Sequence, residues 1–279
     1  MTSRSPHDLD QHDIVLSHFS LGRHFDITDR VRAAAGAGCA GIGLYVGEYH
    51  HLEQSDFAPA RLGELLAEEQ ICLAEIEVLQ GWADPAVVDT ERYRAVEATA
   101  WRMADAFGCR YVQAIGPYVG SVADAGRAFG RLCDRAADHG LVVGLEFLPF
   151  TNIFSATDAL AVVEAADRDN GGICVDNWHH ERGAGDLDLV RTLPADRVMA
   201  IQMSDGPVTP DTDDYVDDCL RHRLAPGEGE FDVGGFVGAL VGAGVTVPWS
   251  LEVCQETAWD TDGRDHVARA VAAMRSFLI

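Results

Sequence analysis

The sequence contains no lysine, because all 21 of its basic residues are arginine. Without a lysine amine the chain cannot form a Schiff base with a carbonyl substrate, hold pyridoxal phosphate covalently or use a P-loop lysine. The 45 acidic residues outnumber the arginines and give a formal net charge of −24. Such a surface repels the phosphate backbone of nucleic acids and anionic membrane faces, so neither is expected as a partner.

Paired cysteines and long hydrophobic runs are also missing. The seven cysteines are scattered, odd in number and never spaced C-x-x-C, which argues against a disulfide framework or a thiolate zinc site. The N-terminus has no apolar run suited to a signal peptide. The most apolar stretch, residues 236–253, contains three glycines, Pro248 and Glu252, and is typical of a helix end and a buried strand rather than of a membrane span. We therefore expect a cytoplasmic protein.

Short apolar runs alternate with amphipathic segments along the whole chain. Eight candidate strands lie at residues 14–20, 41–46, 72–78, 110–115, 141–147, 172–176, 198–204 and 247–254. Candidate helices between or after them include 58–70, 89–107 and 264–278. This alternation predicts an α/β fold, a single-domain (β/α)₈ barrel in residues 1–279, with the barrel at about 14–278. A doubly wound open sheet is the alternative, but no Gly-x-Gly-x-x-Gly turn follows the first strand.

A long segment, residues 205–230, separates the last two candidate strands. Its aspartates are expected to form a solvated acidic surface. Arg221 and Arg223 follow them and precede the compact turn at 226–230. Because long loops at the C-terminal face of a barrel often cover the active site, these arginines are candidates for substrate contact.

Four consecutive candidate strands carry a polar residue at or near their C-terminal ends: Glu146, Asp176, Gln202 and Glu252. The C-terminal strand ends of a barrel converge around its active site. Three carboxylates packed together repel one another unless a cation neutralises them, and an all-oxygen ligand set suits Mn²⁺ or Mg²⁺, with Co²⁺ also possible. Each residue taken alone could instead be a core carboxylate paired with an arginine.

Further polar residues are weaker candidates for the same site. His179 follows Asp176 by three residues and can enter the site from just beyond the strand. Glu75 and Glu77 alternate with apolar neighbours, so both point to one face, where they line the barrel or pair with arginines. His18, Glu48 and Gln113 are candidate pocket residues, whereas Trp82 and Trp178 are expected to pack in the core and His180 to lie at the surface.

The chain resembles the xylose isomerase-like TIM-barrel superfamily, the sugar phosphate isomerase/epimerase group. The resemblance rests on Gly-Leu-Glu146-Phe-Leu-Pro, Val-Asp176-Asn-Trp-His179, Ile-Gln202-Met-Ser-Asp205, Arg223-Leu-Ala-Pro-Gly-Glu-Gly-Glu230 and Leu-Glu252-Val, in family order. It implies one divalent metal held by Glu146, Asp176, Gln202 and Glu252. It also implies that His179 contacts the substrate and that Arg223, or the less well aligned Arg221, binds it.

One position departs from part of that family. Ketose 3-epimerases of the group generally have histidine where Gln202 stands, whereas hydroxypyruvate isomerases and 3-dehydroshikimate dehydratases resemble this chain in having glutamine. The departure weakens an epimerase in the narrow sense and leaves the general metal-enolate chemistry untouched. The histidine-rich zinc cluster of the family's DNA endonucleases is not found in this sequence.

The leading hypothesis is a metal-dependent isomerase or epimerase of a small polyhydroxylated carbonyl compound. Glu146 and Glu252 would take and return a proton through an enediolate, Arg223 would hold an anionic group or the developing oxyanion, and His179 would orient a hydroxyl. A lyase with the same first step is the alternative, either a dehydroshikimate- or inosose-type dehydratase or a C-glycoside-cleaving enzyme. A ligand-binding barrel without turnover is the third reading. Substrate identity and oligomeric state stay open, with a homodimer or homotetramer compatible with the sequence.

Overall fold

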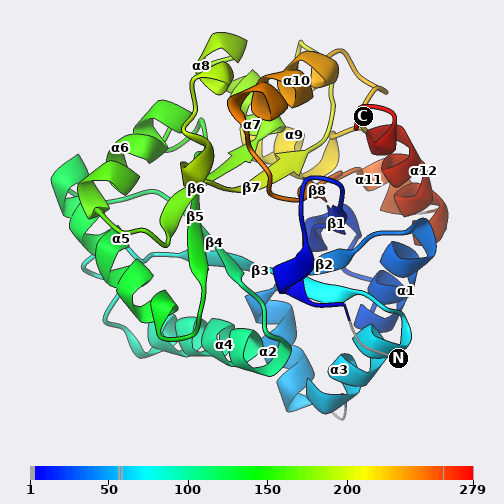
Figure 1. Cartoon of the computed structure of the whole chain (residues 1–279), viewed down its shortest axis with the longest axis horizontal. Coiled ribbons are helices and arrows are strands. Elements are labelled where there is room, and N and C mark those ends of the chain that lie inside the picture. Colours follow the sequence, from blue (N-terminus) through cyan, green and yellow to red (C-terminus); the bar gives the residue numbers. More distant parts are fainter. Residues whose placement is uncertain (1–3, 56, 58, 260, 279) are drawn as a thin grey trace.

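The computed structural model describes residues 4–55, 57, 59–259 and 261–278. Its parallel strands close into an eight-stranded barrel, and helices surround the strands (Figure 1). The strands are β1 (Ile14–Leu16), β2 (Gly41–Tyr45), β3 (Cys72–Gln80), β4 (Tyr111–Ile115), β5 (Val142–Glu146), β6 (Gly171–Asp176), β7 (Val198–Met203) and β8 (Trp249–Leu251). The (β/α)₈ barrel predicted from the sequence is confirmed, and the open-sheet alternative is wrong because β1 pairs with β8.

Helices connect the strands and follow the last one. They are α1 (Ile27–Ala37), α2 (Val46–Gln54), α3 (Pro59–Glu68), α4 (Glu91–Phe107), α5 (Val122–Ala137), α6 (Ala156–Ala166), α7 (Asn177–Arg182), α8 (Leu187–Arg191), α9 (Tyr215–Arg221), α10 (Val233–Ala243), α11 (Glu256–Trp259) and α12 (Gly263–Arg275), with short 3₁₀ turns at Pro6–Asp8, His18–Ser20 and Ala195–Arg197. Local sequence sets many of their ends. Ser121 and Ser155 form capping boxes at the starts of α5 and α6, and Gly38, Gly108 and Gly244 end helices in the left-handed conformation.

Two strands, β1 and β8, end several residues earlier than the sequence predicts. β1 stops at Leu16 because Ser17 caps the 3₁₀ turn His18–Ser20, its hydroxyl accepting a hydrogen bond from the Phe19 amide. β8 stops at Leu251, so Glu252 stands directly beyond the strand. Because β1 and β8 end early, Ser17 and Glu252 lie at the C-terminal rim of the barrel, where the chain leaves the strands.

The long segment 205–230 is an ordered cover with a helix of its own, α9, which the sequence reading did not predict. Its base is fixed by an antiparallel bridge between Asp205 and Leu224. The buried Asp205 carboxylate also accepts hydrogen bonds from the amides of Gly206, Gly227 and Phe231. These bonds hold the Pro-Gly-Glu-Gly-Glu turn and with it the position of the preceding arginine.

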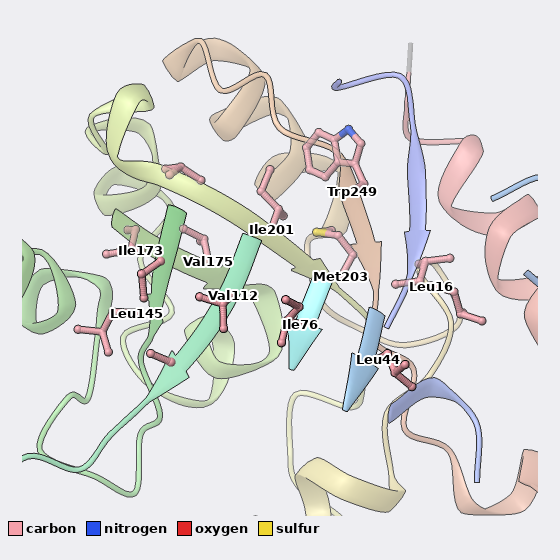
Figure 2. Close-up of a cluster of buried hydrophobic side chains, with 14 of the residues drawn as sticks. Leu16, Leu44, Ile76, Val112, Leu145, Ile173, Val175, Ile201, Met203 and Trp249 are labelled. Carbon is pink, nitrogen blue, oxygen red and sulfur yellow. The ribbon is translucent and has the colours of Figure 1, made fainter. Parts of the chain in front are cut away.

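Strand alternation separates two environments. Ten of the large buried side chains that project from the strands are labelled in Figure 2, among them Leu145, Val175 and Ile201. Their sequence neighbours Glu146, Asp176 and Gln202 point to the other face, since successive strand residues alternate sides. The outer face thus packs against the helices, and the polar strand residues point into the barrel.

Two further sequence expectations concern membranes and thiols. No helix of the described residues is long and apolar enough to cross a membrane. All seven cysteines are buried and free. Trp82 and Trp178 pack in the core, as predicted, but His180 is buried rather than at the surface, because its ring faces Phe236 of α10 at 5.6 Å.

Candidate functional site

The four polar strand-end residues lie together at the C-terminal end of the barrel. Glu146 and Asp176 are the last residues of β5 and β6, Gln202 is the penultimate residue of β7, and Glu252 follows β8. Their exposed fractions are only 4%, 0%, 2% and 6%. An unpaired carboxylate at such depth is costly, so the group requires neutralising partners.

His179 completes a compact cluster with two of these carboxylates. Its Nε2 lies 3.3 Å from Glu146 Oε1 and 3.5 Å from Asp176 Oδ2. Asp176 accepts a hydrogen bond from the Trp178 amide at 2.7 Å, which starts α7 and brings His179 back over the carboxylates. The other ring nitrogen, Nδ1, lies 2.5 Å from the Tyr215 hydroxyl of α9, so the cover orients the imidazole.

Arg223 bridges two of the carboxylates from the cover segment. Its Nη1 lies 2.8 Å from Asp176 Oδ2 and 3.0 Å from Glu252 Oε2, and its Nε donates to the Cys219 carbonyl. Although burial opposes the charged form of Arg223, Asp176 raises its pKa well above the ordinary value. Burial likewise opposes ionisation of Asp176, but the neighbouring Arg223 and His179 hold the pKa of that carboxyl below its ordinary value. The arginine-paired alternative weighed from the sequence is therefore realised for Asp176 and Glu252.

The excess negative charge of the site favours the binding of a divalent cation. With all three carboxyl groups ionised, Glu146, Asp176 and Glu252 would carry three negative charges against the single positive charge of Arg223, a formal balance of −2. Burial, with Asp176 and Glu146 nearby, raises the pKa of Glu252 to about 8 despite Arg223. One ligand atom from each of Glu146, Asp176 and His179 lies within 4.8 Å of the others. Opposite ligands of Mg²⁺ or Mn²⁺ lie roughly 4.2 Å apart, so the cluster fits such an ion after small side-chain shifts.

Two amides border the cluster. The Gln202 Oε1 has only long contacts, 3.4 Å to Gln113 Nε2 and 3.4 Å to Cys174 Sγ, and can serve as an oxygen ligand. Gln113 donates from Nε2 to Glu146 Oε2 at 2.7 Å, whereas its buried Oε1 has no partner. Among the described residues, the ligand atoms that lie within 4.8 Å of one another belong to Glu146, Asp176 and His179, so Glu252 lies outside this group. Gln202 borders Glu146 through Gln113, and the four-residue ligand set stays a prediction.

A second pair of buried carboxylates, Glu75 and Glu77, belongs to β3. Glu77 accepts hydrogen bonds from the Ser17 hydroxyl at 3.0 Å and the His18 amide at 3.1 Å, and burial raises its pKa well above the ordinary value. A Cβ at Gly43 would lie 1.7 Å from Glu77 Oε1, so the glycine makes space for this side chain. Burial raises the pKa of Glu75 to about 7 despite the bond it accepts from Ser250. Both point into the barrel, as expected, and neither pairs with an arginine.

The remaining sequence candidates lie outside the cavity described below. Glu75 lines a separate hollow at the N-terminal end of the barrel. Arg221 is exposed and pairs with Glu256 at 2.6 Å and with Asp217 at 3.1 Å. His18 and Glu48 are half-buried and do not line the cavity, and burial lowers the pKa of His18 to about 3. The structure therefore does not bring Glu75, Arg221 or His18 to the substrate position that the sequence suggested.

A cavity of about 190 Å³ opens from the cluster toward solvent. Its polar lining consists of Gln113, Glu146, His179, Arg223 and Glu252, together with two cysteine thiols. The sequence reading missed the contributions of Tyr215, Ser17 and Cys219. Nothing in their local sequence marks them, because each acts through a contact made across the barrel rim.

The comparisons with known proteins agree with this architecture. A family model described as "Xylose isomerase-like TIM barrel" matches residues 31–277. The chain is 32% identical over 149 residues to the 3-dehydroshikimate dehydratase of Pseudomonas aeruginosa and 29% identical over 123 residues to that of Pseudomonas putida. These matches cover 53% and 44% of this chain but only 23% and 19% of the two relatives.

Solved structures share the fold at low sequence identity. The "IOLI protein with a binding zinc atom" superposes with a TM-score of 0.83 at 15% identity, covering 95% of this chain and 98% of that one. A D-allulose 3-epimerase from Methylomonas sp. in complex with D-allulose gives 0.72 at 18% identity, covering 95% and 96%.

This chain belongs to the xylose isomerase-like TIM-barrel family. Its buried Glu146, Asp176 and His179 form a candidate divalent-metal site at the C-terminal end of the barrel.

Proposed function

We propose that this chain is a divalent-metal-dependent isomerase or epimerase of a hydroxy-carbonyl compound, acting by proton transfer at the carbon beside the carbonyl group. The observation that carries the proposal is the buried Glu146/Asp176/His179 cluster opening into a cavity that Glu252 and Arg223 also line. Glu146, Asp176 and His179 would hold a divalent cation there, for which we propose Mn²⁺ or Mg²⁺, and the chemistry it would supply is polarisation of the carbonyl group.

The residues of the chain divide the work of proton transfer. Glu146 on β5 and Glu252 after β8 line the same cavity from different strands, so one can take the proton and the other can return it. Arg223 places a guanidinium between Asp176 and Glu252, where it stabilises negative charge on a substrate oxygen. His179 Nε2 points at the cluster, where its lone pair can hold the cation, while Tyr215 holds its Nδ1.

Metal content is the first measurement. Elemental analysis of the purified wild type is expected to show about one divalent ion per chain, with the ion lost in a Glu146→Gln/Asp176→Asn variant. Incubation of the metal-loaded wild type with ketoses in D₂O is expected to place deuterium beside the carbonyl of both substrate and isomer. A wild type that refuses every added metal would refute the proposal.

A dehydratase is the second candidate, and two observations favour it. Both curated relatives named above are 3-dehydroshikimate dehydratases, and Gln202 occupies the position where the sequence resemblance associates glutamine with such enzymes. The first step is shared, and a hydroxyl on the next carbon then leaves instead of a proton returning. A new conjugated enone absorbance with no isomer formed would decide for the dehydratase.

A further inference from the structure

The cavity is polar only at its floor. Its walls and mouth are formed by apolar side chains from separate segments, including Phe19, Leu148, Phe150, Val216 and Leu220. Val216 and Leu220 lie one turn apart on α9, and Phe150 follows β5. Phe150, Val216 and Leu220 are 54%, 47% and 45% exposed, which is unusual for large apolar residues beside a buried charged site.

No cation is free to receive an anionic substituent on these walls. Arg223 is the only arginine among the described residues that line the cavity, and Asp176 and Glu252 already engage its Nη1. The sequence has no lysine. A phosphate or carboxylate remote from the cluster would therefore be desolvated without a partner, which is costly.

Hydroxyl groups on the part of a substrate remote from the cluster would also be desolvated without a hydrogen-bond partner. Apart from the floor residues, the described side chains of the wall are aliphatic, aromatic or thiol groups, so a ketose hydroxyl against them loses its water without gaining a side-chain hydrogen bond. The floor differs, because the unpartnered Oε1 of Gln113 is a buried acceptor beside the cluster. The cavity is therefore complementary to a ligand with one polar end and one apolar end.

We propose that the substrate is an uncharged hydroxy-ketone that carries an aryl or alkyl group, with the hydroxy-carbonyl end on the floor and the apolar group against Phe150, Val216 and Leu220. The inference rests on the proposed function and specifies its substrate class. The volume is adequate, since an apolar cavity of roughly 150 Å³ holds a benzene ring and this one measures about 190 Å³.

Three compounds that differ in one group test the inference: 2-hydroxyacetophenone, dihydroxyacetone and dihydroxyacetone phosphate. Each presents HOCH₂–C(=O)– joined to phenyl, hydroxymethyl or phosphorylated hydroxymethyl. Mass spectrometry measures exchange of the carbon-bound hydrogens in D₂O with the Mg²⁺-loaded protein, and each rate is divided by its buffer-catalysed rate. We expect the phenyl compound to exchange at least about tenfold faster than dihydroxyacetone, equivalent to roughly 1.4 kcal/mol, and the phosphate slowest.

Matched variants assign the preference to the wall. Val216→Ser and Leu220→Asn are each expected to lower the ratio of the normalised phenyl rate to the normalised dihydroxyacetone rate about tenfold. Val208→Ser is the control, because Val208 is equally apolar, 65% exposed and absent from the cavity lining. Circular dichroism checks that all three variants fold.

The outcomes separate the inference from the proposed function. Exchange that favours dihydroxyacetone or its phosphate would overturn the substrate class and leave the function standing. A wild-type dimer that dissociates in Leu220→Asn, with unchanged exchange ratios, would show that the mouth is an interface between copies and would likewise overturn it. If no compound exchanges, the function fails. Saturation-transfer NMR of the phenyl protons in Glu146→Gln then tests the apolar site without turnover, and no transfer overturns the inference too.

Discussion

Replacing Arg223 by methionine tests the charge balance of the site. The substitution keeps most of the side-chain volume and removes the positive charge from a place where the arginine side chain is 1% exposed and Asp176 is 0% exposed. Breaking a buried ion pair by removing one partner costs about 3–5 kcal/mol, because the other charge is left buried. We therefore expect the free energy of unfolding of the metal-free Arg223→Met variant to fall by about 3–5 kcal/mol.

A divalent ion should offset part of this loss. Without the guanidinium the formal charge of the site changes from −2 to −3, so the cation binds more strongly and stabilises the variant more than the wild type. An affinity about tenfold tighter corresponds to roughly 1.4 kcal/mol of the loss restored at saturating Mg²⁺. Urea unfolding of both proteins, with and without Mg²⁺, gives the four free energies, and calorimetric titration measures the affinity independently.

Arg182→Met is the matched control. The Arg182 side chain is 6% exposed, pairs with the buried Asp218 at 2.7 Å and lies over the Trp178 ring, away from the carboxylate cluster. Its loss should destabilise the protein by the same amount whether or not Mg²⁺ is present. Equal losses for Arg223→Met with and without Mg²⁺, or a metal-dependent loss for Arg182→Met, would refute the reasoning.

Three further predictions concern protonation, the cover and the histidine. The folded-state pKa of Glu252 is raised to about 8, so in the metal-free protein the stability linked to this carboxyl is full below about pH 4.5 and is lost as pH rises through 8. Metal binding must displace the same proton, so the affinity for Mg²⁺ should rise up to about tenfold per pH unit between pH 6 and 8. A metal affinity that does not change with pH in the wild type, or that changes with the same slope in Glu252→Gln, would contradict this. Tyr215→Phe removes the 2.5 Å contact between the Tyr215 hydroxyl and His179 Nδ1 and should reduce metal affinity or turnover at least about tenfold. Unchanged metal affinity and unchanged turnover would argue against a role of Tyr215 in orienting His179. Asp205→Ala deletes a buried carboxylate that accepts hydrogen bonds from three backbone amides. It should lower the free energy of unfolding by about 3 kcal/mol and speed proteolysis within residues 205–230. Protease resistance equal to that of the wild type would show that the turn is stable without this carboxylate.

Several features could be read from the sequence because they are local. Alternating apolar runs and amphipathic segments predict the strands and helices, and period-two alternation places Glu146 and Asp176 on the face opposite Leu145 and Val175. The position of a polar residue at a strand end predicts convergence, since parallel barrel strands all end at one rim. The boundaries of β1 and β8 were less accurate, because a serine cap and a chain turn, rather than hydrophobicity, end these strands.

Other features depend on contacts between distant segments. His180 looked like a surface residue, yet α10 covers it. Arg221 and Arg223 are two residues apart with similar sequence surroundings, but Arg223 reaches the buried carboxylates whereas Arg221 pairs with Glu256. Contacts of the cover segment with distant residues, such as the bridge between Asp205 and Leu224, separate the two. Likewise, Tyr215 becomes the partner of His179 only after the cover folds onto the rim.

The sequence by itself determined the barrel, the set of carboxylates at its C-terminal end and the absence of any lysine chemistry, since these follow from periodicity and composition. Only the tertiary structure decided that His179 joins Glu146 and Asp176, that Arg223 rather than Arg221 balances their charge, and that apolar side chains form the mouth of the cavity. The physical reason is that the burial and the pairing of charges depend on which distant segments come into contact, and local sequence patterns do not specify those contacts.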